Sequence, residues 1–189
     1  MRRRDEILDA TARVLERNGW DGLTTNAVAR DAGTAIGTVY EYFSSREELL
    51  SGLLARHEVR LREAIDKAVA RGGEDPFAVA DSVVDAFASV WRSEPGYRAA
   101  WSASQTGGLL ERTGDQWAKT FAQRVAQVLR GFFPAASRAS ASVTAQTAVH
   151  LVSGLLLAAM SGPVRQERTM IAETKRALRA YLAARMTSA

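Results

Sequence analysis

The sequence contains no cysteine, only two histidines and four prolines. Without cysteine the chain cannot form disulfides, thiolate zinc sites or a cysteine redox sensor. It also lacks a glycine-rich phosphate loop and a pair of metal ligands at helical spacing. We therefore expect a protein that is not an enzyme and that uses no cofactor or metal.

Long apolar runs are missing as well. The longest, within residues 154–160, is far shorter than the roughly 20 residues that a membrane-spanning helix needs. The first residues, Met1 to Glu6, lead directly into an amphipathic pattern and show no apolar core of a signal peptide. We expect a cytoplasmic protein that does not bind a membrane.

Charge alone does not identify a partner. The net charge of +4 and the isoelectric point near 9.8 are compatible with nucleic-acid binding. However, residues 1–50 contain seven arginines and nine carboxylates, a net charge of −2. A nucleic-acid site in this segment must therefore depend on the local placement of side chains.

Apolar residues recur every three or four positions through most of the chain, the pattern of helices with one buried face. In the first fifty residues this pattern predicts a helix that ends at Asn18-Gly19 and a short helix from Thr24 to Gly33. A third helix is predicted from Ala35 to Tyr42. Ser44 to Glu48 is typical of an N-cap with an acidic first turn, and it opens a long helix.

That long helix should end at Arg71-Gly72-Gly73. The pattern beyond it predicts five more helices, over 75–94, from about 97 to 107, from about 115 to 133, and over 136–161 and 164–186. No segment alternates with a period of two, and no repeat recurs. The sequence predicts an all-α fold of about nine helices, with a three-helix N-terminal domain over 1–47 and a C-terminal domain over 48–189.

The turn after Ala32-Gly33 joins two short helices, which is the layout of a helix-turn-helix whose second helix enters the DNA major groove. An alanine followed by glycine also lets helices cross closely in proteins unrelated to DNA. The residues of the turn alone leave both interpretations open.

The sequence around this turn resembles the TetR family of bacterial transcription regulators. The matching segments are Ile7-Leu8-Asp9-Ala10, Gly19-Trp20, Leu23-Thr24, Val28-Ala29, Ala32-Gly33, Gly37-Thr38-Val39-Tyr40, Tyr42-Phe43 and Arg46-Glu47-Glu48-Leu49-Leu50. The resemblance implies an N-terminal DNA-binding domain and a C-terminal helical domain that dimerises and senses a ligand. In the second domain it extends only to length and helix pattern.

The resemblance implies DNA contacts from the starts and outer faces of the second and third helices. Hydroxyls and backbone N–H groups at Thr24 and Thr25 suit a phosphate, and the Tyr40 hydroxyl is expected to reach one unless this tyrosine belongs to the core. Arg2 to Arg4 are expected to form either a flexible basic arm or a frayed terminus. The expected DNA-binding residues are Arg3, Arg4, Thr24, Thr25, Asn26, Ala35, Ile36, Gly37, Thr38, Tyr40, Tyr42 and Arg46.

The chain departs from the family where serine and lysine often precede the glycine, since it has Ala35 and Ile36 there. Residues 35–42 contain no Arg, Lys, Asn or Gln, the side chains that bind guanine or adenine through two hydrogen bonds. Apolar contact with thymine methyls and recognition of DNA shape are therefore expected, with help from Asn26.

Large aromatic residues concentrate in the middle of the chain, where the resemblance implies a ligand cavity between the central helices. Many rings and few polar groups suit a flat, lipophilic effector, although ordinary core packing explains any single ring equally well. The expected ligand-binding residues are Phe87, Trp91, Tyr97, Trp101, Trp117, Phe121, His150 and Gly154.

The last two predicted helices are rich in small residues, which allow helices to approach closely. The resemblance implies that they pair with their copies in a four-helix dimer interface, which would present two DNA-binding domains to two half-sites. The expected interface residues are Ala148, Leu151, Leu155, Ala158, Ala159, Leu178, Tyr181 and Leu182.

These observations predict a homodimeric, sequence-specific DNA-binding regulator, acting as a repressor that a small lipophilic effector releases from an inverted-repeat operator. Two alternatives remain, a helical protein-interaction scaffold and a TetR-like regulator without effector sensing. The sequence leaves open the effector, the operator and the sign of regulation.

Overall fold

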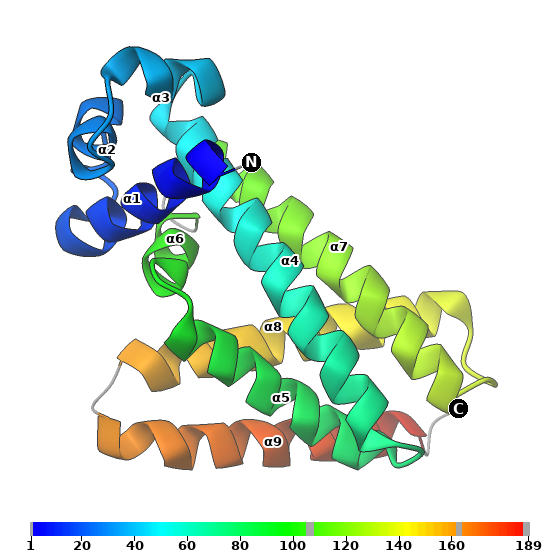
Figure 1. Cartoon of the computed structure of the whole chain (residues 1–189). Coiled ribbons are helices and arrows are strands. Elements are labelled where there is room, and N and C mark those ends of the chain that lie inside the picture. The colour runs from blue at the N-terminus through cyan, green and yellow to red at the C-terminus, as the bar shows by residue number, and fades with distance from the viewer. Residues whose placement is uncertain (1, 105–107, 162–163, 187–189) are drawn as a thin grey trace. The chain divides into compact units, whose positions relative to one another are not determined.

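The structure, a computed structural model, describes residues 2–104, 108–161 and 164–186, with side chains described except at 108–118, 160–161, 164–165 and 186. Over these ranges the chain forms helices and no strand, which confirms the predicted all-α class (Figure 1). The helices are α1 (Arg2–Asn18), α2 (Thr25–Asp31), α3 (Ile36–Tyr42), α4 (Arg46–Gly72), α5 (Pro76–Ser93), α6 (Tyr97–Ser104), α7 (Gly108–Phe132), α8 (Arg138–Ser161) and α9 (Val164–Met186).

Side chains cap several helices where the sequence predicts it. The Ala27 amide donates to Thr24 Oγ1 over 3.1 Å at the start of α2, and the Phe77 amide donates to Asp75 Oδ1 over 2.9 Å at the start of α5. At α4 the Glu48 amide donates to Ser45 Oγ, and α3 has no side-chain cap at Ala35. Local hydrogen bonding thus sets these helix starts.

The predicted start of α7 near Asp115 was wrong, because this helix begins at Gly108. Residues 109–112, Leu-Leu-Glu-Arg, are all good helix formers. Their propensity lets the helix begin at Gly108.

The chain divides into two compact units. The first unit comprises residues 1–60 and 91–115, and the second comprises 61–90 and 116–189. This differs from the predicted boundary between residues 47 and 48, because α6 packs against α1 and brings residues 91–115 into the first unit.

The core of the first unit is built from one face each of α1, α2, α3 and α4, closed by two alanines of α6. It contains Ile7, Leu8, Ala10, Ala12, Val14, Leu15, Leu23, Val28, Ala29, Val39, Phe43, Leu49, Leu50, Leu53, Leu54, Ala100 and Ala103. The three N-terminal helices therefore share a core with a helix that follows about fifty residues later.

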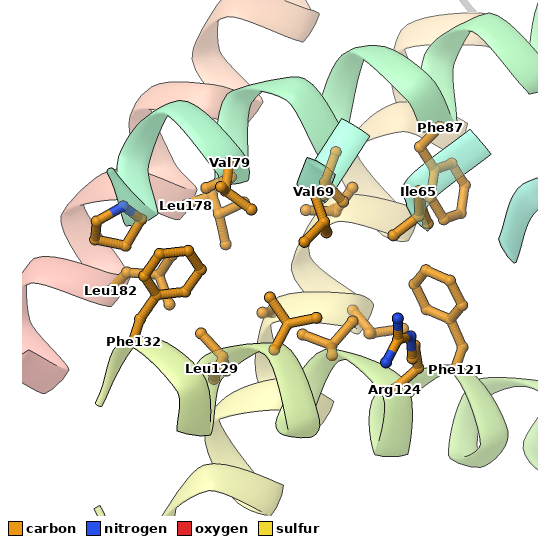
Figure 2. Close-up of a pocket in the computed structure, with 18 residues that line it drawn as sticks. Ile65, Val69, Val79, Phe87, Phe121, Arg124, Leu129, Phe132, Leu178 and Leu182 are labelled. Atoms are coloured by element: carbon orange, nitrogen blue, oxygen red, sulfur yellow. The ribbon is translucent and has the colours of Figure 1, made fainter. Parts of the chain in front are cut away.

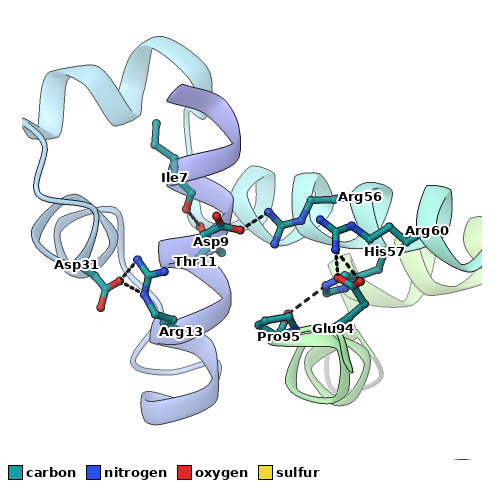
Figure 3. A network of polar contacts seen from close by, with 10 residues as sticks. All are labelled: Ile7, Asp9, Thr11, Arg13, Asp31, Arg56, His57, Arg60, Glu94 and Pro95. Atoms are coloured by element: carbon teal, nitrogen blue, oxygen red, sulfur yellow. Dashed lines mark hydrogen bonds and ion pairs between the residues drawn. The ribbon is translucent and has the colours of Figure 1, made fainter. Parts of the chain in front are cut away.

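The α5–α6 turn (Glu94–Gly96) is bound to both α1 and α4 within the first unit. Figure 3 shows its contacts with α4. Arg60 Nη1 of α4 donates to both carboxylate oxygens of Glu94 over 2.6 Å, and His57 Nε2 donates to the Pro95 carbonyl oxygen over 3.2 Å. The Gly96 amide donates to Glu16 Oε1 of α1 over 2.6 Å. These contacts fix the start of α6 against the N-terminal helices.

Gly96 is required at this turn for two reasons. Its φ of +73° lies in the left-handed region that L side chains avoid. A Cβ at this position would also lie 2.7 Å from Ala12 Cα and Cβ. The backbone of the turn therefore approaches α1 more closely than a side chain allows.

His57 is buried beneath the same turn. Its ring centroid lies 4.7 Å from that of Tyr97, and its Nδ1 has no hydrogen-bond partner among the described residues. Burial lowers the pKa of His57 to about 4, and the positive charges of Arg56 and Arg60 act in the same direction. The imidazole is therefore neutral in the folded protein near pH 7.

In the second unit, α8 and α9 pack along each other. Ion pairs connect α5 to α9, between Asp85 and Lys175 over 2.7 Å and between Asp81 and Arg179. Among the described helices, only α8 (over Arg138–Ala159) is long and apolar enough to cross a membrane by length and composition. Within its apolar 18-residue stretch, 44% is buried within the fold. The buried core helix of a globular domain meets the same criterion.

We predict that Gly96→Ala lowers the free energy of unfolding by roughly 2–4 kcal/mol, combining left-handed backbone strain with overpacking against Ala12. Gly73→Ala is the matched control, because Gly73 has φ +65° but open space around the added Cβ, so only the strain of about 1 kcal/mol remains. Urea denaturation followed by circular dichroism measures both. Equal losses in the two variants would contradict the close approach at the turn.

We also predict that stability falls as the pH drops from 6.5 towards 4. The unfolded chain protonates His57 near 6.5 and the folded chain only near 4, so within this window the unfolded state binds the extra proton. The full effect, roughly 3 kcal/mol, is present above pH 6.5. His57→Gln keeps an N–H donor for Pro95 but cannot titrate, so its pH dependence should be flatter.

His150→Gln is the control for this measurement, since it makes the same substitution at an exposed histidine. Denaturation midpoints at several pH values give the comparison. An unchanged slope in His57→Gln would show that the buried imidazole does not cause the acid sensitivity.

Candidate functional site

The outer face of α2 and α3 presents a pair of hydroxyl groups. Tyr40 is 54% exposed, and its hydroxyl lies 3.2 Å from Thr25 Oγ1 across the two helices. This exposure excludes the alternative of a core tyrosine. Thr24 is exposed, although its hydroxyl accepts the α2 cap bond, and Asn26 beside it is exposed as well.

The rest of α3 exposes apolar surface. Ile36 is 36% and Tyr42 43% exposed, Ala35 and Gly37 are exposed, and Thr38 is half-buried. Such a surface is unusual for a helix in water and suits contact with an apolar group such as the thymine methyl.

Glu41 is the one ionised side chain in α3, and it is exposed. Glu41 was not among the expected DNA-binding residues, which are cationic, amide, hydroxyl-bearing or apolar. A carboxylate at this position can accept a hydrogen bond from the cytosine amino group.

The basic residues of this region are held by the fold. Arg46 lies over the Trp20 ring with its guanidinium carbon 4.5 Å from the ring centroid, and its Nε donates to Glu47 over 3.1 Å. Arg3 pairs with Glu6 over 2.7 Å, and Arg4 lies over the Phe43 ring. The expectation of a flexible basic arm was wrong, because these residues form the first turn of α1.

Asp31 at the end of α2 binds two arginines of α1. Arg13 Nε donates to Asp31 Oδ2 over 2.7 Å, and Arg17 binds Oδ1. The hydrogen bond from Arg17 and the pairing with Arg13 hold the pKa of Asp31 below its ordinary value. These two ion pairs thus orient α2 on α1.

The second unit encloses an apolar cavity between α4, α5, α7, α8 and α9 (Figure 2). Its volume is about 70 Å³. Phe87 and Phe121 face each other at one end, at a centroid separation of 6.0 Å, and Phe132 and Leu182 lie at the other. Of the eighteen lining residues, Arg124 is the only one that is not apolar.

Arg124 is neutralised within the fold. Its Nη2 and Nε donate to Asp66 Oδ1 over 2.7 and 3.1 Å. The cavity therefore has one cation at its edge, and that cation already carries a carboxylate partner.

The aromatic residues expected to line one cavity are divided between the two units. Phe87 and Phe121 line the cavity, while Trp91, Tyr97 and Trp101 are buried together in the first unit at centroid distances of 5.5 and 6.4 Å. His150 and Gly154 are exposed, and Trp117 lies outside the residues whose side chains are described.

Of the residues expected at a dimer interface, some are buried inside the chain and others lie at its surface. Ala148, Ala159, Leu178 and Leu182 are buried inside the chain, and three of them line the cavity: Ala148, Leu178 and Leu182. Leu151, Leu155, Ala158 and Tyr181 reach the surface, so these four remain as candidates for contact with a partner.

Family models match both parts of the chain. Residues 7–53 match the model described as bacterial regulatory proteins, tetR family. Residues 74–186, more than half of the chain, match the tetracyclin repressor-like C-terminal domain.

Curated relatives match parts of the chain. The repressor KstR of Mycolicibacterium smegmatis is 39% identical over 71 residues, which cover 38% of this chain and 35% of KstR. The regulator SrpR of Pseudomonas putida is 30% identical over 129 residues, covering 67% of this chain and 59% of SrpR. The matched segments thus span between a third and three fifths of these relatives.

Solved structures share the whole fold. A TetR-family regulator from Streptomyces coelicolor is 25% identical with a TM-score of 0.77, covering 96% of this chain and 98% of that one. The SmeT–triclosan complex is 19% identical with a TM-score of 0.74, covering 97% and 91%.

Proposed function

Because the chain belongs to the TetR family of bacterial transcription regulators, we propose that it is a homodimeric, cytoplasmic repressor that a small lipophilic effector releases from its operator. The observation that carries the proposal is the contact between the exposed Tyr40 and the half-buried Thr25 on a helix-turn-helix. Two hydroxyls held 3.2 Å apart across α2 and α3 are suited to grip one phosphate of the DNA backbone.

Base recognition in this proposal depends on α3. Ile36 and Ala35 contact thymine methyls, and Tyr42 and Thr38 supply further apolar and hydroxyl contacts. Glu41 accepts from a cytosine amino group where one is present. The absence of a basic base-reading side chain in α3 favours an A·T-rich half-site whose shape contributes to recognition.

The apolar cavity of the second unit is the proposed effector site. Its lining favours lipophilic molecules, and proteins of the same fold include SmeT with bound triclosan and, among curated relatives, a nicotine-responsive repressor. A volume of about 70 Å³ is well below the roughly 300–1,000 Å³ of typical ligand sites. Binding must therefore widen the cavity.

Helix α4 carries residues of both the helix-turn-helix region and the cavity, so widening of the cavity can affect DNA binding through it. Its first residue, Arg46, belongs to the helix-turn-helix region, while Ile65 and Val69 near its end line the cavity. A ligand that separates α4 from α7 changes the position of α4, and an effector that favours one of two positions shifts the equilibrium between operator-bound and released states.

Dimerisation through α8 and α9 completes the proposal. Leu151, Leu155, Ala158 and Tyr181 provide surface for contact with a second copy, which would supply the second half-site contact of an inverted repeat.

We predict that Tyr40→Phe and Thr25→Ala each weaken operator binding roughly tenfold, since each removes a hydroxyl contact from both half-sites of the dimer. Selection of genomic fragments by the purified protein identifies the operator, and fluorescence anisotropy then measures the dissociation constants. Thr169→Ala, an exposed threonine of α9, is the control and should bind as wild type does. If no fragment is selected, the chain is better explained as a helical scaffold.

The cavity can be tested without knowing the effector. We expect the neutral lipophilic dye N-phenyl-1-naphthylamine to fluoresce when it binds wild-type protein, and Val125→Phe, which fills the cavity, to weaken dye binding at least about fivefold through loss of space. Val59→Phe adds the same volume at an exposed position of α4 and should bind as wild type does. Equal binding by all three proteins would place the dye elsewhere and contradict this site.

A further inference from the structure

A second hollow lies beside one end of the cavity and shares lining residues with it. It is formed where α7 ends, α8 begins and α9 ends, and its volume is about 270 Å³. Leu129, Phe132 and Leu182 line both spaces. Phe132 and Leu182 lie at the end of the cavity opposite Phe87 and Phe121 (Figure 2), so the hollow adjoins that end.

The hollow differs from the cavity in having a polar group at its wall. Arg185 of α9 lines it together with Ser140 and Thr144 of α8. Arg185 Nη2 donates to Ser140 Oγ over 3.0 Å, and Arg185 Nε donates to Thr144 Oγ1 over 3.2 Å. Thr144 is buried and Ser140 half-buried, so two hydroxyls orient the guanidinium at the wall.

The charge of Arg185 is not neutralised by any carboxylate in the described part of the chain, since its two bonds go to neutral hydroxyls. Its Nη1 group remains available to a ligand. Each hydroxyl oxygen accepts from Arg185, so each hydroxyl hydrogen is also free to donate. Arg124 at the opposite end, in contrast, is paired with Asp66.

The volumes of the two spaces also favour a ligand that reaches beyond the cavity. The apolar cavity alone, at about 70 Å³, has room for little more than a few heavy atoms, while the hollow beside Arg185 is several times larger. A ligand of ordinary size therefore needs space beyond the cavity, and the hollow is the adjacent space that shares lining residues with it. A ligand that occupies both has an apolar part between Phe132 and Phe87 and a polar part beside Arg185.

We propose that the effector is an anionic amphiphile with a linear apolar chain, whose carboxylate is bound by Arg185, Ser140 and Thr144 and whose chain extends into the cavity towards Phe87. The proposal rests on the function proposed above, in which this cavity is the effector site. Charge-assisted hydrogen bonds from a guanidinium and two hydroxyls select the anion over a neutral head group, and the apolar lining selects the chain.

Decanoate and decan-1-ol are the probes, because they share a chain length and differ in the head group. We expect isothermal titration calorimetry to show that wild-type protein binds decanoate at least about tenfold more tightly than decan-1-ol. Arg185→Gln should lose this preference while binding decan-1-ol as wild type does. Arg176→Gln removes the same charge from an exposed position of α9 and should keep the preference.

Equal binding of the two probes by wild-type protein, no binding of decanoate, or the same loss in both variants would overturn the proposed head-group site. Operator binding by the same preparations separates this result from the proposed function. If the protein binds its operator but does not prefer decanoate, the proposed repressor function stands and the proposal of an amphiphilic effector is rejected. Decanoate binding without any operator binding rejects the repressor.

Discussion

The close approach of the α5–α6 turn to α1 is the constraint on which the first unit depends. Gly96 has no side chain, so its backbone can lie against Ala12 and donate to Glu16. This contact positions α6, and two alanines of α6 then close the core shared by the first four helices. The segment that carries the residues proposed to contact DNA is therefore stabilised by a part of the chain that lies beyond the end of α4.

Most of the helices could be predicted from the sequence because their signals are local. Thr24, Ser45 and Asp75 cap the helices that follow them, and a cap is specified within three residues of sequence. The exposure of Tyr40 was not decided by the sequence, which left a core tyrosine as the alternative, and the structure shows it. The family resemblance then assigned a role that these local signals alone did not provide.

The partners of buried residues could not be predicted in this way. Phe87 and Trp91 are four residues apart on α5 and lie on the same face, yet the first lines the cavity and the second packs with Tyr97 in the other unit. The periodicity of apolar residues predicts that one face of a helix is buried, but not which residues pack against that face. The pairing of Arg124 with Asp66, 58 residues apart, could not be predicted for the same reason. The sequence therefore did not show that Arg124 has a carboxylate partner while Arg185 binds two neutral hydroxyls.

The internal ion pairs of the N-terminal helices have a consequence for how the proposed operator complex responds to its ionic surroundings. Arg3, Arg13, Arg17 and Arg46 each have a carboxylate partner within this region, and residues 1–50 carry a net negative charge. Few arginines are left to displace the cations condensed on DNA, and that displacement drives binding to arbitrary sequences. Such a protein gains little from a random stretch of chromosome, so most of its occupancy falls on the operator itself.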